Sequence, residues 1–154
     1  MTRDIEAVRR ALPLRFPYLM VDRVLEEGEG RVVAVKNVTI GEPVFQGHFP
    51  SPHPAVMPGT LILEAMAQTV AFLLLEGEEE GLGFLVGVDK ARFRRKVVPG
   101  DQLRLEARLL KRKRGLVRAE VRASVSGETA ATAIISLVAA EGEKAEREQD
   151  QDVE

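Results

Sequence analysis

Between residues 46 and 68, this chain of 154 residues brings together the groups needed for acid–base chemistry. His48 lies in a segment with five prolines from Pro43 to Pro58, so its backbone should be stiff and well ordered. A helix is predicted to begin at Gly59, where the first N–H groups of a helix have no intrahelical partner. Glu64 follows about one turn further on.

Each of these groups has a role in removing water from the carbon β to a thioester. Histidine titrates near neutral pH and can act as the base that takes the α proton. A carboxyl in apolar surroundings tends to keep its proton and can act as the acid. Free N–H groups at a helix start stabilise a developing oxyanion. The sequence thus predicts His48 as base, Glu64 as acid and the N–H groups of the helix start as donors to the carbonyl oxygen.

The same residues also have purely structural interpretations. A single histidine in a loop is more often structural than catalytic, and His53 is interpreted in that way. Glu64 could pair with an arginine or cap a neighbouring strand. Gln68 could orient Glu64 or bind the backbone. Because His48 and Glu64 flank a helix start, the catalytic interpretation is favoured.

The helix that carries Glu64 is predicted over residues 59–76. Leu, Ala, Met, Glu and Gln favour helix, and Pro58 stands where a first-turn proline is tolerated. The segment is apolar nearly all round, which indicates a buried helix. Thr60, Glu64 and Gln68 form one polar stripe at a spacing of four residues.

The remaining pattern is rich in strands. Residues 31–40 are rich in β-branched types, and apolar residues alternate with polar ones over 103–109 and 117–125. Further strands are predicted at 84–90 and 92–98, a strand buried on both faces at 129–140, and a short helix at 4–11. One long buried helix with an antiparallel meander predicts an α+β fold, a curved sheet wrapped around the helix.

Composition and charge limit the class of protein. The chain has no cysteine and no apolar start typical of a signal peptide, and its longest apolar run, 61–75, is shorter than the ~20 residues of a membrane span. We therefore expect a cytoplasmic protein without membrane insertion or nucleic-acid binding. Residues 141–154 carry a net charge of −5 and are expected to form a flexible acidic tail after a single domain, 1–140.

Basic residues cluster just before residue 100, at Arg92, Arg94, Arg95 and Lys96. They could be solvated residues of a strand edge, or a docking surface for an acidic partner.

Several separated motifs carry a resemblance to a known family. They are LPLRFPYLMVDRV from Leu12, GHFP from Gly47, MPG from Met57, EAMAQ from Glu64, DKARFRR from Asp89 and VPGDQ from Val98. In this order, over residues 10–140, they resemble the β-hydroxyacyl-acyl-carrier-protein dehydratases of fatty-acid synthesis. Two extra residues separate His48 from Glu64 relative to the usual family spacing.

The resemblance implies a hot-dog fold and a (3R)-3-hydroxyacyl substrate carried by acyl carrier protein, converted to the trans-2-enoyl thioester. It also implies homodimers, often assembled as hexamers, in which His48 of one subunit meets Glu64 of the other. Gln68 would support Glu64, and the Gly59 N–H would polarise the thioester. The acidic carrier is a candidate partner for the basic cluster, and no metal or dissociable cofactor is implied.

Two other functions remain open on the sequence. A hot-dog acyl-thioesterase would use the helix carboxylate to activate water and would need no loop histidine. A non-catalytic acyl-carrier-binding subunit would keep the fold without turnover. The GHFP motif around His48 favours the dehydratase.

Overall fold

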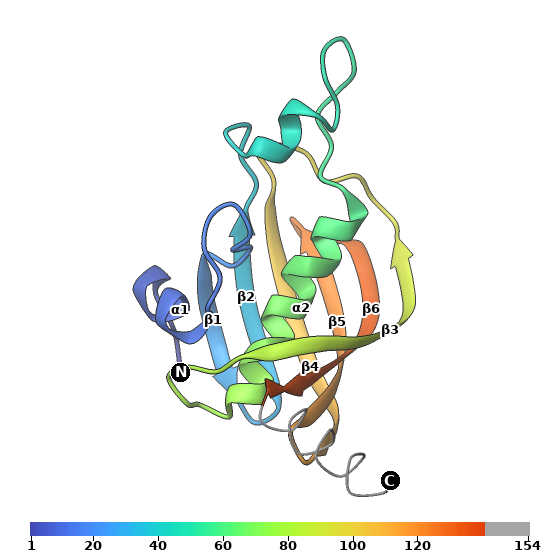
Figure 1. Cartoon of the computed structure of the whole chain (residues 1–154). Helices are drawn as coiled ribbons and strands as arrows, with labels where there is room; N and C mark the ends of the chain where they lie inside the picture. Colours follow the sequence, from blue (N-terminus) through green and yellow to red (C-terminus); the bar gives the residue numbers. More distant parts are fainter. Residues whose placement is uncertain (141–154) are drawn as a thin grey trace, which may run out of the picture.

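In the computed structural model, which describes residues 1–140, a six-stranded antiparallel sheet curves around one long helix (Figure 1). The strands lie in the order β1-β2-β4-β5-β6-β3, so β1 and β3 form the two edges. Their bounds are β1 Arg23–Gly28, β2 Arg31–Asn37, β3 Gly83–Phe93, β4 Gln102–Lys113, β5 Leu116–Val125 and β6 Glu128–Ala139. The helices are α1 Ile5–Ala11, the 3-10 helix η1 Pro43–Gln46 and the central α2 Gly59–Leu75. The predicted tail, 141–154, lies outside the described residues.

The predicted short helix is present as α1, and it begins with a side-chain cap. The Asp4 carboxylate accepts a hydrogen bond from the Ala7 N–H at 2.9 Å, which satisfies one of the free donors at the helix start. The helix ends before Pro13, whose ring cannot continue it.

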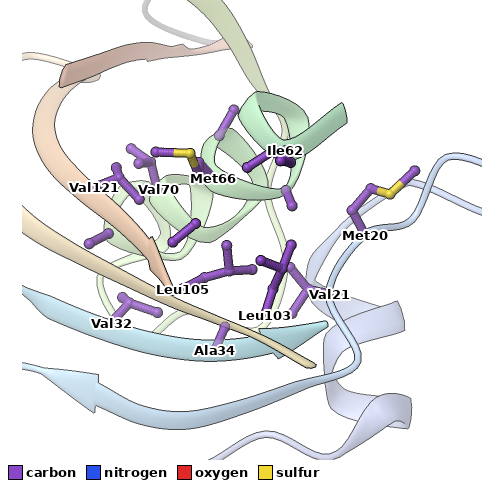
Figure 2. Packing of buried hydrophobic residues seen from close by; sticks show 14 of the residues in the cluster. Met20, Val21, Val32, Ala34, Ile62, Met66, Val70, Leu103, Leu105 and Val121 are labelled. Atoms are coloured by element: carbon purple, nitrogen blue, oxygen red, sulfur yellow. The ribbon is translucent and has the colours of Figure 1, made fainter. Parts of the chain in front are cut away.

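The core lies between the concave face of the sheet and α2. Alternate residues of the strands point inward, so Val32 and Ala34 of β2 lie beside Leu105 of β4 in the packing against the helix (Figure 2). The inward positions of β5 and β6 include several alanines: Ala119, Ala123, Ala131 and Ala133. These small side chains leave room for the larger helix residues, which include Met66 beside Val121 of β5 (Figure 2).

The helix prediction is confirmed. The polar stripe along α2 becomes more buried from its first residue to its last. Thr60 is exposed, Glu64 is half-buried and Gln68 is 3% exposed. Among the described residues, no helix is long and apolar enough to cross a membrane.

Two parts of the sheet differ from the prediction. Residues 84–98 do not form two strands, because β3 runs without a break from Gly83 to Phe93 and bends at two irregularities in its pairing with β6. The strand β1 was not predicted, since only one of its six residues, Val24, is fully buried and its pattern lacks a clear apolar alternation. Strand β6 is largely buried, with some half-buried positions such as Ile134.

The Leu105 side chain should be a main contributor to stability. It is fully buried against α2, so Leu105→Ala should lower the free energy of unfolding by about 2–5 kcal/mol. Urea denaturation followed by circular dichroism measures this change. Leu110 of the same strand is 46% exposed, and Leu110→Ala should change stability by less than about 0.5 kcal/mol. Equal losses of unfolding free energy in the two variants would contradict the burial of Leu105 against α2.

Candidate active site

His48 is held in a loop that leaves the sheet after β2 and returns to α2 (Figure 1). Its N–H donates to the Val44 carbonyl of η1 at 3.0 Å, and its own carbonyl accepts from the Val56 N–H at 3.1 Å. The Val56 N–H bond closes the proline-rich segment 49–55 into a loop whose ends are fixed. The two residues that are additional to the usual family spacing therefore lie in a segment whose two ends are joined by hydrogen bonds.

The contacts of the His48 ring define its tautomer. Nδ1 lies 2.6 Å from the Val56 carbonyl oxygen, which can only accept a hydrogen bond. Nδ1 must therefore carry the hydrogen, and the neutral ring has its lone pair on Nε2. The Phe49 ring stacks on the imidazole with centroids 3.9 Å apart. An imidazole held in this way can take a proton at Nε2.

The start of α2 is shaped by the close approach of an aromatic ring. A Cβ at Gly59 would lie 3.0 to 3.3 Å from three atoms of the Phe93 ring, so a larger residue would press on that ring. Pro58 offers no side-chain cap, and within residues 1–140 no hydrogen bond from the Gly59 or Thr60 N–H is present. These donors can bind an oxygen that gains negative charge.

Glu64 is positioned by a buried amide. The Gln68 side chain donates from Nε2 to Glu64 Oε1 at 2.9 Å and to the Tyr18 carbonyl at 2.8 Å. Its Oε1 accepts from the Met20 N–H at 2.7 Å. Both alternatives for Gln68 thus occur together, because one side chain binds the carboxylate and the backbone. Tyr18 and Met20 were not predicted as part of this arrangement.

A cavity opens beside Glu64 and Gln68, and its lining is otherwise apolar. It continues along α2 past Ala67 and Ala71. The remaining lining residues come from three other segments of the chain: Leu12, Pro13, Leu14, Gly81, Leu82, Gly83, Leu85 and Leu137. Such a lining suits an aliphatic chain, with one carboxylate at the polar end.

Within one chain, the predicted base and acid do not meet. His48 is not part of the cavity that Glu64 lines, and among residues 1–140 no hydrogen bond joins the two side chains. Gly59 lies instead in a shallow groove with Val56, Phe93 and the basic segment.

The basic cluster divides into two kinds of residue. Arg95 is engaged within the chain, with ion pairs to Glu128 at 3.1 Å and Asp101 at 3.8 Å. Arg94 and Lys96 are exposed and line the groove beside Gly59. Arg92 is exposed on β3 and donates to the carbonyl of the preceding residue. The described residues hold no group of three or more His, Cys, Asp or Glu side chains placed to bind a metal ion.

Comparison with known proteins identifies the family. The model of the FabA-like domain matches residues 12–134, which is most of the chain. The chain belongs to the FabA-like family. Among curated relatives, the 3-hydroxyacyl-[acyl-carrier-protein] dehydratase FabZ of Streptococcus thermophilus is 51% identical over 139 residues, covering 89% of this chain and 97% of the relative. The FabZ of Thermus thermophilus is 54% identical over 138 residues, covering 88% and 96%.

Solved structures agree with the FabA-like fold. The dehydratase heterocomplex ApeI:P of Xenorhabdus doucetiae superposes with a TM-score of 0.72 at 21% identity, covering 86% of this chain and 90% of the other. A hypothetical thioesterase of Streptococcus pneumoniae, solved with coenzyme A, gives 0.58 at 13% identity, covering 75% and 83%. The predicted hot-dog arrangement is confirmed. Because thioesterases share it, the fold alone does not separate the candidate reactions.

Gln68 should be important for stability in this FabA-like chain as well as for the position of Glu64. Gln68→Met keeps the volume but leaves the buried Met20 N–H without a partner, whereas the carbonyl of exposed Tyr18 can bind water instead. The free energy of unfolding should fall by about 1–3 kcal/mol, the cost of one unsatisfied buried group. Gln102→Met is the matched control, because Gln102 is exposed and binds only Asn37 Oδ1. A change below about 0.5 kcal/mol is expected there, and an equal loss in both variants would exclude this role.

Proposed function

We propose that this chain is a cytoplasmic 3-hydroxyacyl-[acyl-carrier-protein] dehydratase with His48 and Glu64 as its catalytic pair. The observation that carries the proposal is the identity of about half with FabZ dehydratases over nearly their whole length. The local geometry supports it, because the bond of His48 Nδ1 to the Val56 carbonyl leaves Nε2 as the basic nitrogen, and Glu64 lines an otherwise largely apolar cavity. A (3R)-3-hydroxyacyl chain would place its tail in that cavity.

The reaction needs two proton transfers and one hydrogen-bond donor to the thioester carbonyl oxygen. The Nε2 atom of His48 takes the α proton, and the electrons of the broken C–H bond move into an enolate whose oxygen is held by the Gly59 N–H. The electrons then form the α–β double bond as the β hydroxyl leaves. Glu64 protonates that hydroxyl, so water departs and the trans-2-enoyl thioester remains. Each group acts at a different atom of the substrate.

The two halves of the site would come from two subunits. Strand β3 is an edge strand of the sheet, and its exposed side chains include Phe84, Leu85 and Val86, each at least 44% exposed in the single chain. An apolar open edge is a surface that needs a cover, and a second copy of the same strand can pair with it. A homodimer formed there would join two sheets, and a hexamer would combine three such pairs. His48 would then act with the partner subunit's Glu64.

The carrier protein would approach the groove at the start of α2. Arg94 and Lys96 flank Gly59 there, and Arg92 lies nearby in sequence on β3. An acidic carrier would be attracted to these side chains while its phosphopantetheine arm enters beside Phe93. Arg95 would contribute less, since its charge is already paired with Glu128.

Replacement of the proposed base tests the reaction. His48→Ala should lower the rate of crotonyl-thioester hydration by at least about 100-fold, the lower range of general-base contributions, while far-UV circular dichroism stays unchanged. His53→Ala is the matched control, because His53 lies exposed in the same loop. Hydration is followed by loss of the enoyl absorbance. Full activity of His48→Ala would reject its role, and hydrolysis of the thioester by that variant would favour the thioesterase.

Mixing two inactive variants tests whether the site is shared. Glu64→Gln removes the proposed acid and should also lower the rate by orders of magnitude, since general acids contribute about 100- to 10,000-fold. After subunit exchange with His48→Ala, a mixed dimer would contain one site with both native groups. When equal amounts of the two variants exchange subunits, half of the dimers should be mixed, and each mixed dimer should have one intact site out of two. About a quarter of wild-type activity is therefore expected. No recovery after exchange verified by mass spectrometry would contradict a shared site.

A further inference from the structure

A charged side chain lies on the core-facing side of β2. Lys36 alternates with Val32 and Ala34, which point toward α2, and it stands opposite Leu103 of β4. It is only 5% exposed. A buried ammonium group is costly unless a counter-charge and hydrogen bonds compensate it.

The counter-charge comes from Glu42, the residue immediately before η1. Lys36 Nζ lies 2.8 Å from Glu42 Oε1, and the two side chains are 6% and 22% exposed. The other carboxylate oxygen accepts from the Thr39 N–H at 3.0 Å, and the Glu42 carbonyl accepts from the Phe45 N–H at 3.1 Å. Glu42 therefore ties the end of β2 to the first turn of η1.

The same helical turn fixes the catalytic loop. The Val44 carbonyl accepts from the N–H groups of Gly47 at 3.2 Å and His48 at 3.0 Å, while the Phe45 side chain is buried in the core. His48 is thus held from two sides, by η1 before it and by Val56 after it. Among residues 1–140, η1 is the one of these two supports that is anchored by an ion pair, with a buried lysine.

We infer that Lys36 and Glu42 are positioning residues for His48, an inference that rests on the proposed dehydratase function. The pair fixes η1 against the sheet, and η1 sets where the imidazole stands. Loss of either charge leaves the other buried without its counter-charge, so η1 would shift toward water and carry His48 with it. A displacement of about 1 Å at a reacting group can lower a rate by about 100-fold.

A second buried ion pair supplies the matched control. Arg3 and Glu27 lie 2.6 Å apart with side chains 7% and 5% exposed, so the cation is about as buried as Lys36 and the carboxylate is more buried than Glu42. Arg3 also donates to the Glu78 carbonyl, which follows the C-terminal end of α2. The His48 loop precedes the opposite end of that helix. Glu27→Gln should lower stability and leave turnover unchanged.

The kinetic experiment compares these variants as purified full-length protein, well below their unfolding temperatures. Glu42→Gln and Lys36→Met should each lower kcat for crotonyl-thioester hydration by about 10- to 100-fold, with KM changed less than about twofold. Lys36→Arg keeps a cation and should retain most of the wild-type kcat. The double variant removes both charges, avoids an unpaired buried ion, and should lose no more than either single variant.

Nuclear magnetic resonance gives a readout that does not depend on activity. The chain has two histidines, so protein labelled with ¹⁵N-histidine shows two imidazoles. Glu42→Gln should shift the His48 Nδ1 and Nε2 signals and leave those of exposed His53 unchanged, whereas Glu27→Gln should shift neither.

The outcomes distinguish the positioning role of Lys36 and Glu42 from the proposed dehydratase function. Wild-type kcat and unchanged His48 signals in Glu42→Gln would overturn the positioning role, as would an equal kcat loss in Glu27→Gln. A wild-type protein without hydratase activity would reject the proposed function alone, because the imidazole signals would still report whether Glu42 positions His48.

Discussion

The hydrogen bond between His48 Nδ1 and the Val56 carbonyl is the constraint on which the proposed chemistry depends. A carbonyl can only accept, so this contact assigns the ring hydrogen to Nδ1 and leaves Nε2 free as a base. The bond also joins the two ends of a loop rich in proline. The two additional residues inferred from the sequence lie between these ends and can therefore be accommodated without displacing the imidazole.

The position of Glu64, the proposed acid, follows a different principle. Glu64 is placed by one turn of helix and by the amide of Gln68, which at the same time satisfies two backbone groups of the segment before β1. A buried amide with each of these bonds made is rigid, because a rotation would break several bonds together. Helix α2 thus carries the carboxylate, and a segment about 50 residues earlier in the chain supports it.

Much of the fold could be predicted from the sequence, for reasons that differ from one element to the next. Helix α2 was predicted to within one residue of its end, because its composition is uniform and Pro58 marks its start. Strands β4 and β5 were predicted by alternation. The unbroken β3 was not, since Lys90, in the left-handed region at φ 52°, lies beside an irregularity that interrupts the alternation without ending the strand. The Gln68 contacts to Tyr18 and Met20, and the Lys36–Glu42 pair, required the tertiary fold, because nothing local specifies them.

The separation of His48 from Glu64 within one chain bears on the assembly as well as on the mechanism. Three features of the described residues are incomplete in one subunit: the proposed base lies apart from the proposed acid, the cavity beside Glu64 does not include His48, and the edge strand β3 exposes apolar side chains. A second copy paired along β3 would complete all three together, whereas a foreign partner would have to supply a histidine of matching geometry. Burial of the β3 side chains would then stabilise the dimer and exclude water from the acyl cavity, so that assembly and catalysis would depend on the same edge of the sheet.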